Sequence, residues 1–490
     1  MPRVPLLGNP YDGQSVIASG QECINLYGEV NKNPQSPSPI TYYQTPGLIS
    51  FAQSPTGAGK VRCTYRSTLD TAYIVIDTTV YLMLRNGTLS VIGTITDLPT
   101  QVIMADNGLV VVLVDSVSGW VIEMATNNFA QITDPNFYGA AFVILLDTFF
   151  VFNRPNTNQF YISVSQPDYA TFVADAAFDP LDIAAKSGSA DYIVGITTVH
   201  KELWLIGQLT TEVWIGTGAA DFYFQLQQGA YIDHGCAAPY SITATDVIVF
   251  FIMRDRTGNC MIVKGGGYEL ADISTPFIVK ELKSYSTVED AIGFCFQLDD
   301  HPFFALIFPT ANKTWLYELK TGMWARWCWT DNDGNFNRHR SNCGMFVYDK
   351  NYVGDWQNGK IYELSSVTYN DDRQPIVRVR TCPHFMGPEF NRVNYISLDA
   401  DMQVGTSPQV DLDADPPEEL PKVSLSWSDN RGVSYGNAVE QSLGNEGEFS
   451  TVLSWNRLGQ ARDRVFKLQW SANIDTALNN IFITTKQART

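Results

Sequence analysis

Four basic side chains gather near the end of the chain, within the stretch RLGQARDRVFKLQW (457–470). They are Arg457, Arg462, Arg464 and Lys467. Clustered cations of this kind bind phosphate groups, dock an acidic partner or form ion pairs within a fold. The whole protein is acidic, with 33 Lys+Arg against 51 Asp+Glu and a formal net charge of −18. That balance argues against a protein that coats DNA or reads its sequence, because phosphate binding requires concentrated positive charge.

The alternation of side chains along a strand divides this cluster into two faces. Phe466, Leu468 and Trp470 are expected on a buried face, and Arg464 shares their parity at the beginning of the strand. Lys467 is expected on the opposite face.

The other two cations, Arg457 and Arg462, are expected to flank Gly459 in a turn between two strands. Asp463 follows directly and is placed to neutralise them in part. We therefore interpret the four cations as a partner-docking edge or an internal ion-pair corner of a C-terminal domain, and not as a DNA clamp.

Residue patterns that would support catalysis or cofactor binding are missing from the sequence. The five histidines are far apart and none shows the short spacing of a metal-ligand pair. SPTGAGKV (54–61) lacks the first glycine of a phosphate-binding loop and places Val61 where a magnesium-binding hydroxyl is needed. The acidic pairs at 299–300 and 331–333 resemble turn tips. No catalytic residue, metal ligand or cofactor is predicted, and the protein is not expected to be an enzyme.

Two motifs keep an alternative function open. WSDNRGVSYG (427–436) is a degenerate Asp-box hairpin, a turn motif found in sialidases and other propellers. MWARWCWTDNDG (323–334) could offer a carbohydrate platform, although Trp324 is expected to face away from Trp327 and Trp329, which favours core packing. The alternative is a propeller that binds or degrades polysaccharide, either a lectin or a glycosidase.

Between residues 72 and 366 the chain repeats one pattern, which is a β-branched or aromatic strand, a turn with Gly, Asn or Asp, and a further strand. The repeats lie at 72–95, 108–133, 146–172, 201–229, 246–273, 301–327 and 344–366. Four-stranded units at intervals of about 40–50 residues are typical of a β-propeller. A sandwich or a solenoid would also use short strands, but the constant order within the units favours the propeller. The sequence predicts an all-β fold with a propeller of six or seven blades at 61–370.

The regions before and after these repeats differ from them in composition and in the pattern of strands. Residues 1–60 are rich in Pro, Asn and Gly and are predicted to form an extended N-terminal arm. Residues 371–490 contain three alternating strands that end in Trp427, Trp455 and Trp470, which predicts an antiparallel β-sandwich. Phe449 is expected to share the buried face of the strand that ends in Trp455. An acidic loop at 401–422 interrupts this domain.

Short signatures in a fixed order give the chain a resemblance to a known family. They are ECINLYGEVNKN…YYQTPGL (22–48), TEVWIGTGAADF (211–222), KELKSYSTVEDAIGFCFQLDDHPFFALIFP (280–309) and LSWSDNRGVSYG…VLSWNRLGQARDRVFKL (425–468). The sequence resembles the tail hub, or nozzle, proteins of short-tailed phages of the P22 type, the family also called packaged-DNA stabilisation or head-completion proteins. The acidic loop is the one insert-like departure from that pattern.

The resemblance implies a structural virion protein in the phage tail, made in the cytoplasm of the bacterial host. Such proteins form a homo-oligomeric ring, taken to be a hexamer, below the portal and its adaptor ring. The ring extends the DNA channel, helps to retain packaged DNA and carries the tail fibres or spikes and the needle or plug. Phage DNA is expected to pass through it without sequence-specific binding, and no cofactor is implied.

Overall fold

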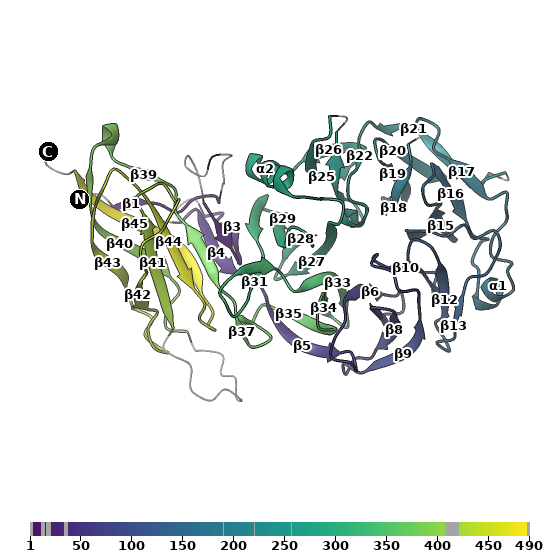
Figure 1. The fold of residues 1–490 in the computed structure, drawn as a ribbon, viewed down its shortest axis with the longest axis horizontal. Coiled ribbons are helices and arrows are strands. Elements are labelled where there is room, and N and C mark those ends of the chain that lie inside the picture. Colours follow the sequence, from purple (N-terminus) through teal and green to yellow (C-terminus); the bar gives the residue numbers. More distant parts are fainter. Residues whose placement is uncertain are drawn as a thin grey trace.

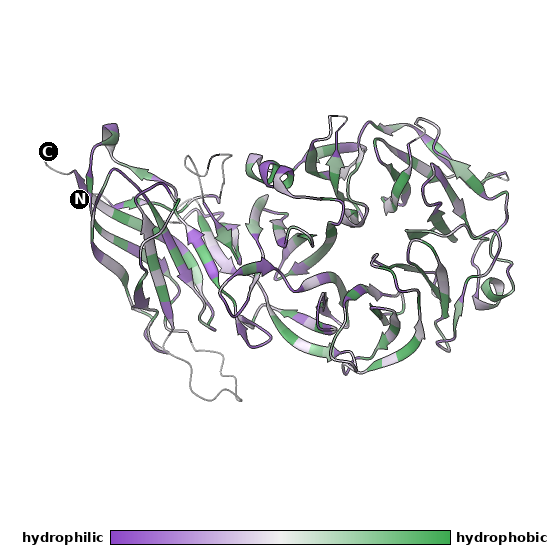
Figure 2. Cartoon of the chain, in the orientation of Figure 1, coloured by the Kyte–Doolittle hydropathy of each residue, from purple (hydrophilic) through white to green (hydrophobic). Residues whose placement is uncertain are grey.

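The computed structural model describes residues 3–10, 15, 21–33, 38–189, 191–219, 221–255, 257–406 and 421–487. Within these residues the protein is all-β and consists of a ring of sheets beside a flatter two-sheet domain (Figure 1). Hydrophobic residues concentrate in the strands of both domains (Figure 2). No described helix is long and apolar enough to span a bilayer. Most of the acidic loop predicted at 401–422 lies outside the described residues.

The ring is a β-propeller, and its first four sheets each use four strands that are consecutive in sequence. From the centre outward, the first blade contains β6 (Val61–Arg66), β7 (Ala72–Ile76), β8 (Thr79–Met83) and β9 (Leu89–Thr94). The second contains β10 (Ile103–Asp106), β11 (Val110–Val114), β12 (Gly119–Glu123) and β13 (Phe129–Gln131). The third contains β14 (Val143–Leu146), β15 (Phe149–Asn153), β16 (Gln159–Ile162) and β17 (Ile183–Ala185), with α1 (Tyr169–Val173) before its last strand. The fourth contains β18 (Ile193–Val199), β19 (Glu202–Gly207), β20 (Thr211–Gly216) and β21 (Phe224–Ile232).

The fifth and sixth blades carry small irregularities. In the fifth, the inner position is divided between β22 (Gly235–Cys236) and β23 (Thr243–Ala244), with η1 (Pro239–Ser241) between them. Its outer strands are β24 (Val249–Arg254), β25 (Cys260–Gly266) and β26 (Glu269–Asp272). After α2 (Pro276–Ser284), the sixth blade contains β27 (Ile292–Leu298), β28 (His301–Phe308), β29 (Lys313–Glu318) and β30 (Met323–Arg326). A hairpin of β31 (Cys328–Thr330) and β32 (Phe336–Arg338) leads to the next blade.

The seventh blade closes the ring with a strand from the other end of the chain. Its inner strands are β33 (Ser341–Val347), β34 (Lys350–Asp355) and β35 (Lys360–Ser365), and its outer strand is β5 (Gly47–Gln53), antiparallel to β35. The short strands β36 (Asn370–Asp371) and β37 (Gln374–Pro375) extend this sheet. Within the described chain the propeller therefore has seven blades, which decides between the six and seven expected from the sequence.

The second domain is the expected antiparallel sandwich, and it also recruits N-terminal strands. One sheet has the order β3 (Leu26–Val30), β4 (Ile40–Gln44), β45 (Ala477–Gln487), β40 (Val393–Met402) and β43 (Leu453–Ala461), with β1 (Arg3–Pro5) paired to β45. The other has the order β2 (Cys23–Ile24), β38 (Arg378–Thr381), β44 (Asp463–Trp470), β41 (Lys422–Ser428) and β42 (Val439–Ser442), with β39 (Phe385–Met386) also paired to β44. The short η2 (Pro388–Phe390) precedes β40.

Residues 1–60 were predicted to be an arm outside both domains, and the described part of this segment is instead built into both. β1, β3 and β4 complete one sandwich sheet, β5 closes the propeller, and β2 joins the two domains. Ile24 of β2 pairs in parallel with Arg326 of β30 and antiparallel with Val379 of β38, so one sheet runs from the sixth blade into the sandwich. Edge strands in both domains leave backbone groups unpaired, and this segment satisfies them.

The three tryptophans predicted to line the sandwich interior lie in its core. Trp455 of β43 and Trp470 of β44 are buried, and Trp427 of β41 packs against the same cluster. Phe449, predicted to share the buried face of the strand ending at Trp455, is 74% exposed. That expectation was wrong because the strand begins only at Leu453, after turns that contain two glycines at positive φ.

Candidate functional site

The predicted cation cluster lies on and around β44 of the sandwich. Arg464, Phe466, Leu468 and Trp470 are all buried on one face, as the alternation predicted. Lys467 is half-buried on the opposite face, with its ammonium 4.1 Å from the ring centre of Tyr435. The strand therefore uses its arginine within the core and its lysine near the surface.

Arg464 makes an internal ion pair. Its Nε and Nη2 donate to the two carboxylate oxygens of Asp429 at 2.5 and 2.8 Å, a bidentate arrangement that fixes both groups. Its Nη1 donates to the carbonyl of Leu458. The guanidinium also lies 4.5 Å from the ring centre of Tyr395 and 5.5 Å from that of Trp427. With 2% of its surface exposed, Arg464 stabilises the sandwich and is not available as an exposed docking group.

The Asp-box-like segment supplies the carboxylate for this pair. Ser428 Oγ accepts from the Gly432 amide at 2.8 Å, and Asn430 Oδ1 accepts from the Ser434 amide at 2.9 Å. Gly432 has φ +86°, which an L side chain rarely adopts. The turn between β41 and β42 therefore holds Asp429 toward Arg464, which gives the motif a structural role in this protein.

Arg457 and Arg462 are exposed, but the turn predicted between them is not formed as expected. Arg457 and Gly459 have positive φ and lie in a β-bulge inside β43, where the register to β40 shifts opposite Ile396. The strand ends later, at the single-residue bend of Arg462, where the chain passes from β43 in one sandwich sheet to β44 in the other. The bulge turns Leu458 inward, which aims its carbonyl at Arg464.

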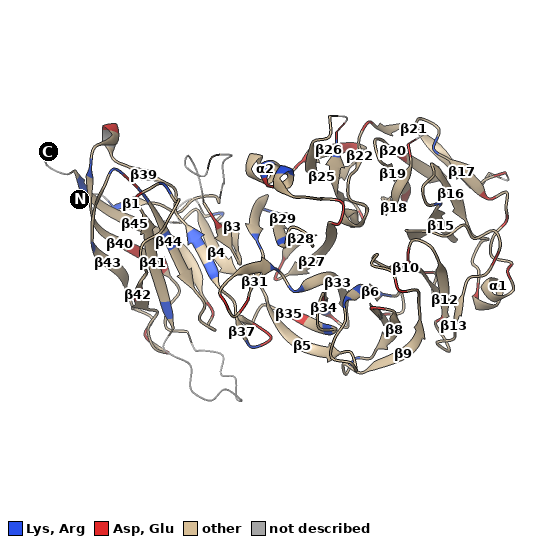
Figure 3. Ribbon diagram, in the orientation of Figure 1, with Lys and Arg blue, Asp and Glu red and all other residues tan. Residues whose placement is uncertain are grey.

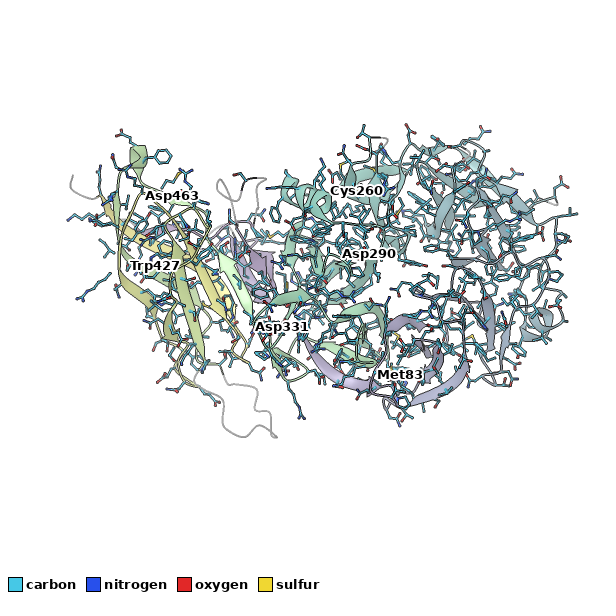
Figure 4. The ribbon with its side chains drawn as sticks, in the orientation of Figure 1. Met83, Cys260, Asp290, Asp331, Trp427 and Asp463 are labelled. Atoms are coloured by element: carbon cyan, nitrogen blue, oxygen red, sulfur yellow. The ribbon has the colours of Figure 1, made fainter. Side chains whose placement is uncertain are left out.

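Asp463 was expected to neutralise Arg457 and Arg462, and its carboxylate faces other partners. His384 Nδ1 lies 3.1 Å from Asp463 Oδ1, and Arg431 Nε lies 3.3 Å from Oδ2 (Asp463 is labelled in Figure 4). The four cations thus form no single patch. Arg457 and Arg462 remain exposed candidates for docking, whereas Arg464 and Lys467 are occupied within the domain.

The acidic pairs noted in the sequence lie in turns. Asp299 and Asp300 both have positive φ in the loop between β27 and β28. Asp331, labelled in Figure 4, accepts hydrogen bonds from the amides of Asp333 and Asn335 in the β31–β32 turn. Among the described residues, no group of three or more His, Cys, Asp or Glu side chains could hold a metal ion.

The tryptophan cluster at 323–334 divides between different environments. Trp324 and Trp327 are buried in two separate hydrophobic clusters, as expected for residues on opposite faces. Trp327 stacks on His339 with ring centres 3.6 Å apart, and burial holds the pKa of His339 well below its usual value. Trp329 is half-buried beneath the guanidinium of Arg340, 4.2 Å from its ring centre. This arrangement packs blades together and leaves no open aromatic platform among these three residues.

Two further arginines of structural importance were missed at the sequence level. Arg378 and Arg380 of β38 are fully buried. Arg380 donates to the carbonyl of Gly8 at 3.0 Å and to the hydroxyl of Tyr42 at 3.2 Å, which ties the N-terminal segment to the sandwich. The alternation in VRVR (377–380) was a signal that both arginines share one face, but nothing local indicated that this face is buried.

Two family models match the chain in the order of its domains. The model described as "Bacteriophage P22 Gp10, beta-propeller" matches residues 23–369, and the one described as "Bacteriophage P22 Gp10, beta-sandwich" matches residues 385–486. A comparison with curated proteins gives no match.

Solved structures with a similar fold are distant in sequence. The Cps50 (Swd1) β-propeller domain from Myceliophteria thermophila is 8% identical, covers 65% of this chain and 99% of that chain, and has a TM-score of 0.42. The WD40 β-propeller domain of Doa1 is 8% identical, covers 65% and 97%, and has a TM-score of 0.39. The two family models together span nearly the whole chain, and the protein belongs to the bacteriophage P22 Gp10 family of phage structural proteins.

Proposed function

We propose that the protein is a tail hub of a short-tailed phage, a non-enzymatic ring component that extends the DNA channel below the portal and its adaptor. The observation that carries this proposal is the match of both domains, in order, to a family of phage structural proteins. In this role it helps to retain packaged DNA and anchors the tail fibres or spikes and the needle.

The way in which the domains are joined supports a mechanical role. A single sheet passes from the sixth blade through β2 into the sandwich, and the same N-terminal segment supplies the closing strand of the propeller. Backbone hydrogen bonds on both sides of β2 resist relative movement of the domains. A rigid two-domain unit suits a component that holds partners on different surfaces.

The charge balance supports passage of DNA without sequence-specific binding. The net charge is −18, and three of the sandwich arginines, Arg378, Arg380 and Arg464, are buried in internal contacts. A surface of this kind repels phosphate at long range and offers few direct contacts to it. We assign the exposed Arg457 and Arg462 to protein docking, between ring subunits or toward the adaptor.

The oligomeric state tests the central part of the proposal. Light scattering and electron microscopy of the purified full-length protein should reveal a closed ring, alone or after addition of an adaptor ring. A protein that stays monomeric and binds neither adaptor rings nor tail particles would contradict the proposal. Release of reducing sugar from host polysaccharide would contradict the non-enzymatic role and favour the alternative glycosidase.

The docking assignment has its own test in a charge reversal. The double substitution Arg457→Glu and Arg462→Glu should weaken ring or adaptor assembly at least tenfold and leave DNA affinity unchanged, since a like-charge contact replaces an attractive one. Lys201→Glu, an exposed cation in a turn of the fourth blade, serves as the matched control. Assembly equal to wild type, or a selective loss of DNA binding, would refute the assignment.

A further inference from the structure

A second group of cations, distinct from the one on β44, lies where the sixth, seventh and first blades meet. Arg338 ends β32, Arg340 directly precedes β33, and Lys60 directly precedes β6. The segments are joined by hydrogen bonds: the Trp356 amide donates to the Arg340 carbonyl at 3.3 Å, and Asn342 Nδ2 donates to the Val61 carbonyl at 2.8 Å. Basic residues are visible at the ends of β6 and β33 in Figure 3.

Arg338 is the central member of this group. Only 6% of its surface is exposed, and its guanidinium lies 4.2 Å from the ring centre of Trp356. Among the described residues its side chain has neither a hydrogen-bond acceptor nor an ion-pair partner, and its Nη1 is fully buried. A buried charge without a counterion is strongly unfavourable, and native proteins rarely leave one unsatisfied.

Three more donors around Arg338 are buried without an acceptor within the described chain. They are Nε of Arg340 and the indole Nε1 atoms of Trp356 and Trp329. Arg340 has one anionic contact, from its Nη1 to Asp355 Oδ2 at 3.4 Å. The site therefore holds several N–H donors that lack an acceptor within the described chain.

Burial also disfavours the charged forms of two of these cations. Burial lowers the pKa of Arg338 to about 10 and lowers that of Lys60, with Arg338 and Arg62 adding to the effect on Lys60. The Asp355 carboxylate already accepts from two backbone amides, at Gln357 and Asn358, besides Arg340. The lysine ammonium has no acceptor among the described residues.

Asp290 adds a further observation that restricts the kind of ligand. Its Oδ2 accepts from the Thr310 amide at 2.7 Å, whereas its Oδ1 is buried without a donor among the described groups. The charges of Asp355 and Asp290 both act on Arg338 without an ion pair to it, and the label of Asp290 in Figure 4 lies beside the central opening of the propeller. An anion that itself carries a proton could donate to this oxygen while it accepts from the cations.

We propose that Arg338, Arg340, Lys60 and the two indoles form a binding site for inorganic phosphate at this junction of the propeller. Hydrogen phosphate supplies several acceptor oxygens for the orphaned donors and one proton for Asp290, whereas sulfate at neutral pH has no such proton. The burial of Arg338 favours a small free ion over the phosphate of a nucleic acid backbone, which would bring bulky neighbours with it. Occupied, the site would link three consecutive blades.

Stability of the full-length protein against phosphate concentration tests the site. At constant ionic strength, phosphate at 100 times its Kd should raise the apparent folded-to-unfolded ratio about 100-fold, and chloride or sulfate should have a much smaller effect. Arg338→Met should abolish the phosphate response. Arg85→Met is the matched control, because Arg85 also lies over a ring, 4.7 Å from the centre of Tyr348, but is exposed and paired with Asp70.

Several outcomes would overturn the proposal. Equal effects of phosphate and chloride, or an unchanged response in Arg338→Met, would mean that an adventitious ion only is bound. A response to a short oligonucleotide without one to inorganic phosphate would identify a backbone phosphate as the ligand and refute the free ion. If Arg338→Met fails to fold, Lys60→Gln replaces it and must weaken phosphate binding measured by calorimetry; wild-type affinity in that variant would refute the site.

Discussion

The sandwich and the propeller each bury an arginine against an aromatic ring, but only the sandwich provides it with an anion. Arg464 lies over Tyr395 and is held by both oxygens of Asp429. Arg338 lies over Trp356 at a similar distance and has no acceptor within the described chain. In the sandwich, an arginine stacked on an aromatic ring thus belongs to a complete ion pair. In the propeller, an arginine in similar stacking lacks the anion of such a pair.

This difference shows that burial and stacking alone do not define the role of a cation. Removing one partner of a buried pair leaves an uncompensated charge, whereas removing a charge that has no partner relieves a desolvation penalty. The same substitution should therefore destabilise the protein at Arg464 but not at Arg338. Four predictions follow from this contrast, beginning with the largest effect.

A buried carboxylate extends the comparison to the opposite charge. Burial raises the pKa of Asp371 in β36 to about 7, although Arg340 and Arg378 act in the other direction. The folded protein thus holds this proton up to about pH 7, while the unfolded chain releases it near the ordinary carboxyl pKa of 3.8. Stability contributed by Asp371 is therefore present at low pH and lost as the pH rises from about 4 to 7.

The substitution Asp371→Asn should remove that pH dependence. Relative to wild type, the variant should gain stability between pH 4 and 7, by on the order of 4 kcal/mol at most from the pKa difference. Chemical denaturation at a series of pH values measures this gain. A difference between variant and wild type that does not change with pH would show that the carboxylate is ionised in the fold.

Arg464→Met should destabilise the sandwich by about 3 kcal/mol, since it leaves Asp429 without its bidentate partner. The half-exposed position of Asp429 places the effect at the lower end for a buried pair. Asp429→Asn should also destabilise the sandwich, because Arg464 then keeps only its hydrogen bond to the Leu458 carbonyl. Denaturation followed by tryptophan fluorescence measures the unfolding free energy of both variants. An Arg464→Met variant as stable as wild type would contradict the contrast between the two domains.

Arg338→Met, in buffer free of phosphate, should be neutral or stabilising by about 1 kcal/mol, because an apolar chain of similar length replaces a buried charge that has no hydrogen bond or ion pair within the described chain. The same denaturation experiment, run beside Arg464→Met, measures the difference in sign. A loss as large as that of Arg464→Met would mean that Arg338 already has a counterion in the folded chain.

The smallest effect on stability is expected for the two exposed arginines, Arg457 and Arg462. Arg457→Glu and Arg462→Glu together should change the unfolding free energy of the isolated protein by less than about 0.5 kcal/mol, as for most surface substitutions. Thermal unfolding of the dilute protein measures this, separately from the assembly assay. A larger loss would mean that the bulge in β43 depends on these charges.

Most of the fold could be predicted because its signals are local. Six of the seven blades repeat strands and turns that are adjacent in sequence, and the parity of Arg464 with Phe466 is a property of one strand. The bulge at Arg457 could not be predicted, since it depends on the register between β43 and the distant β40. The assignment of 1–60 to an arm failed for the same reason: β1, β2, β4 and β5 each pair with a strand that lies more than 270 residues later.

The cation site of the propeller was also beyond the reach of local patterns. RHR (338–340) is visible in the sequence, but the tryptophans under its arginines come from two different segments. The ion pair of Arg464 with Asp429 could not be predicted either, because the sequence motif around Asp429 predicts a turn but not which residue that turn contacts. Pairings of charges across sheets follow from topology and not from spacing.

The closing strand has a consequence for how the protein is made. β5 leaves the ribosome early, yet its partner β35 ends only at Ser365, and the sandwich strand β45 that holds β4 comes later still. At about 5–20 residues per second, β5 must wait on the order of 15–60 s for its place in the seventh blade. Throughout that time β5 lacks its antiparallel partner, and an unpaired strand is prone to aggregation. A host chaperone that shields this strand during translation should therefore raise the yield of the full chain more than it helps a finished protein to refold.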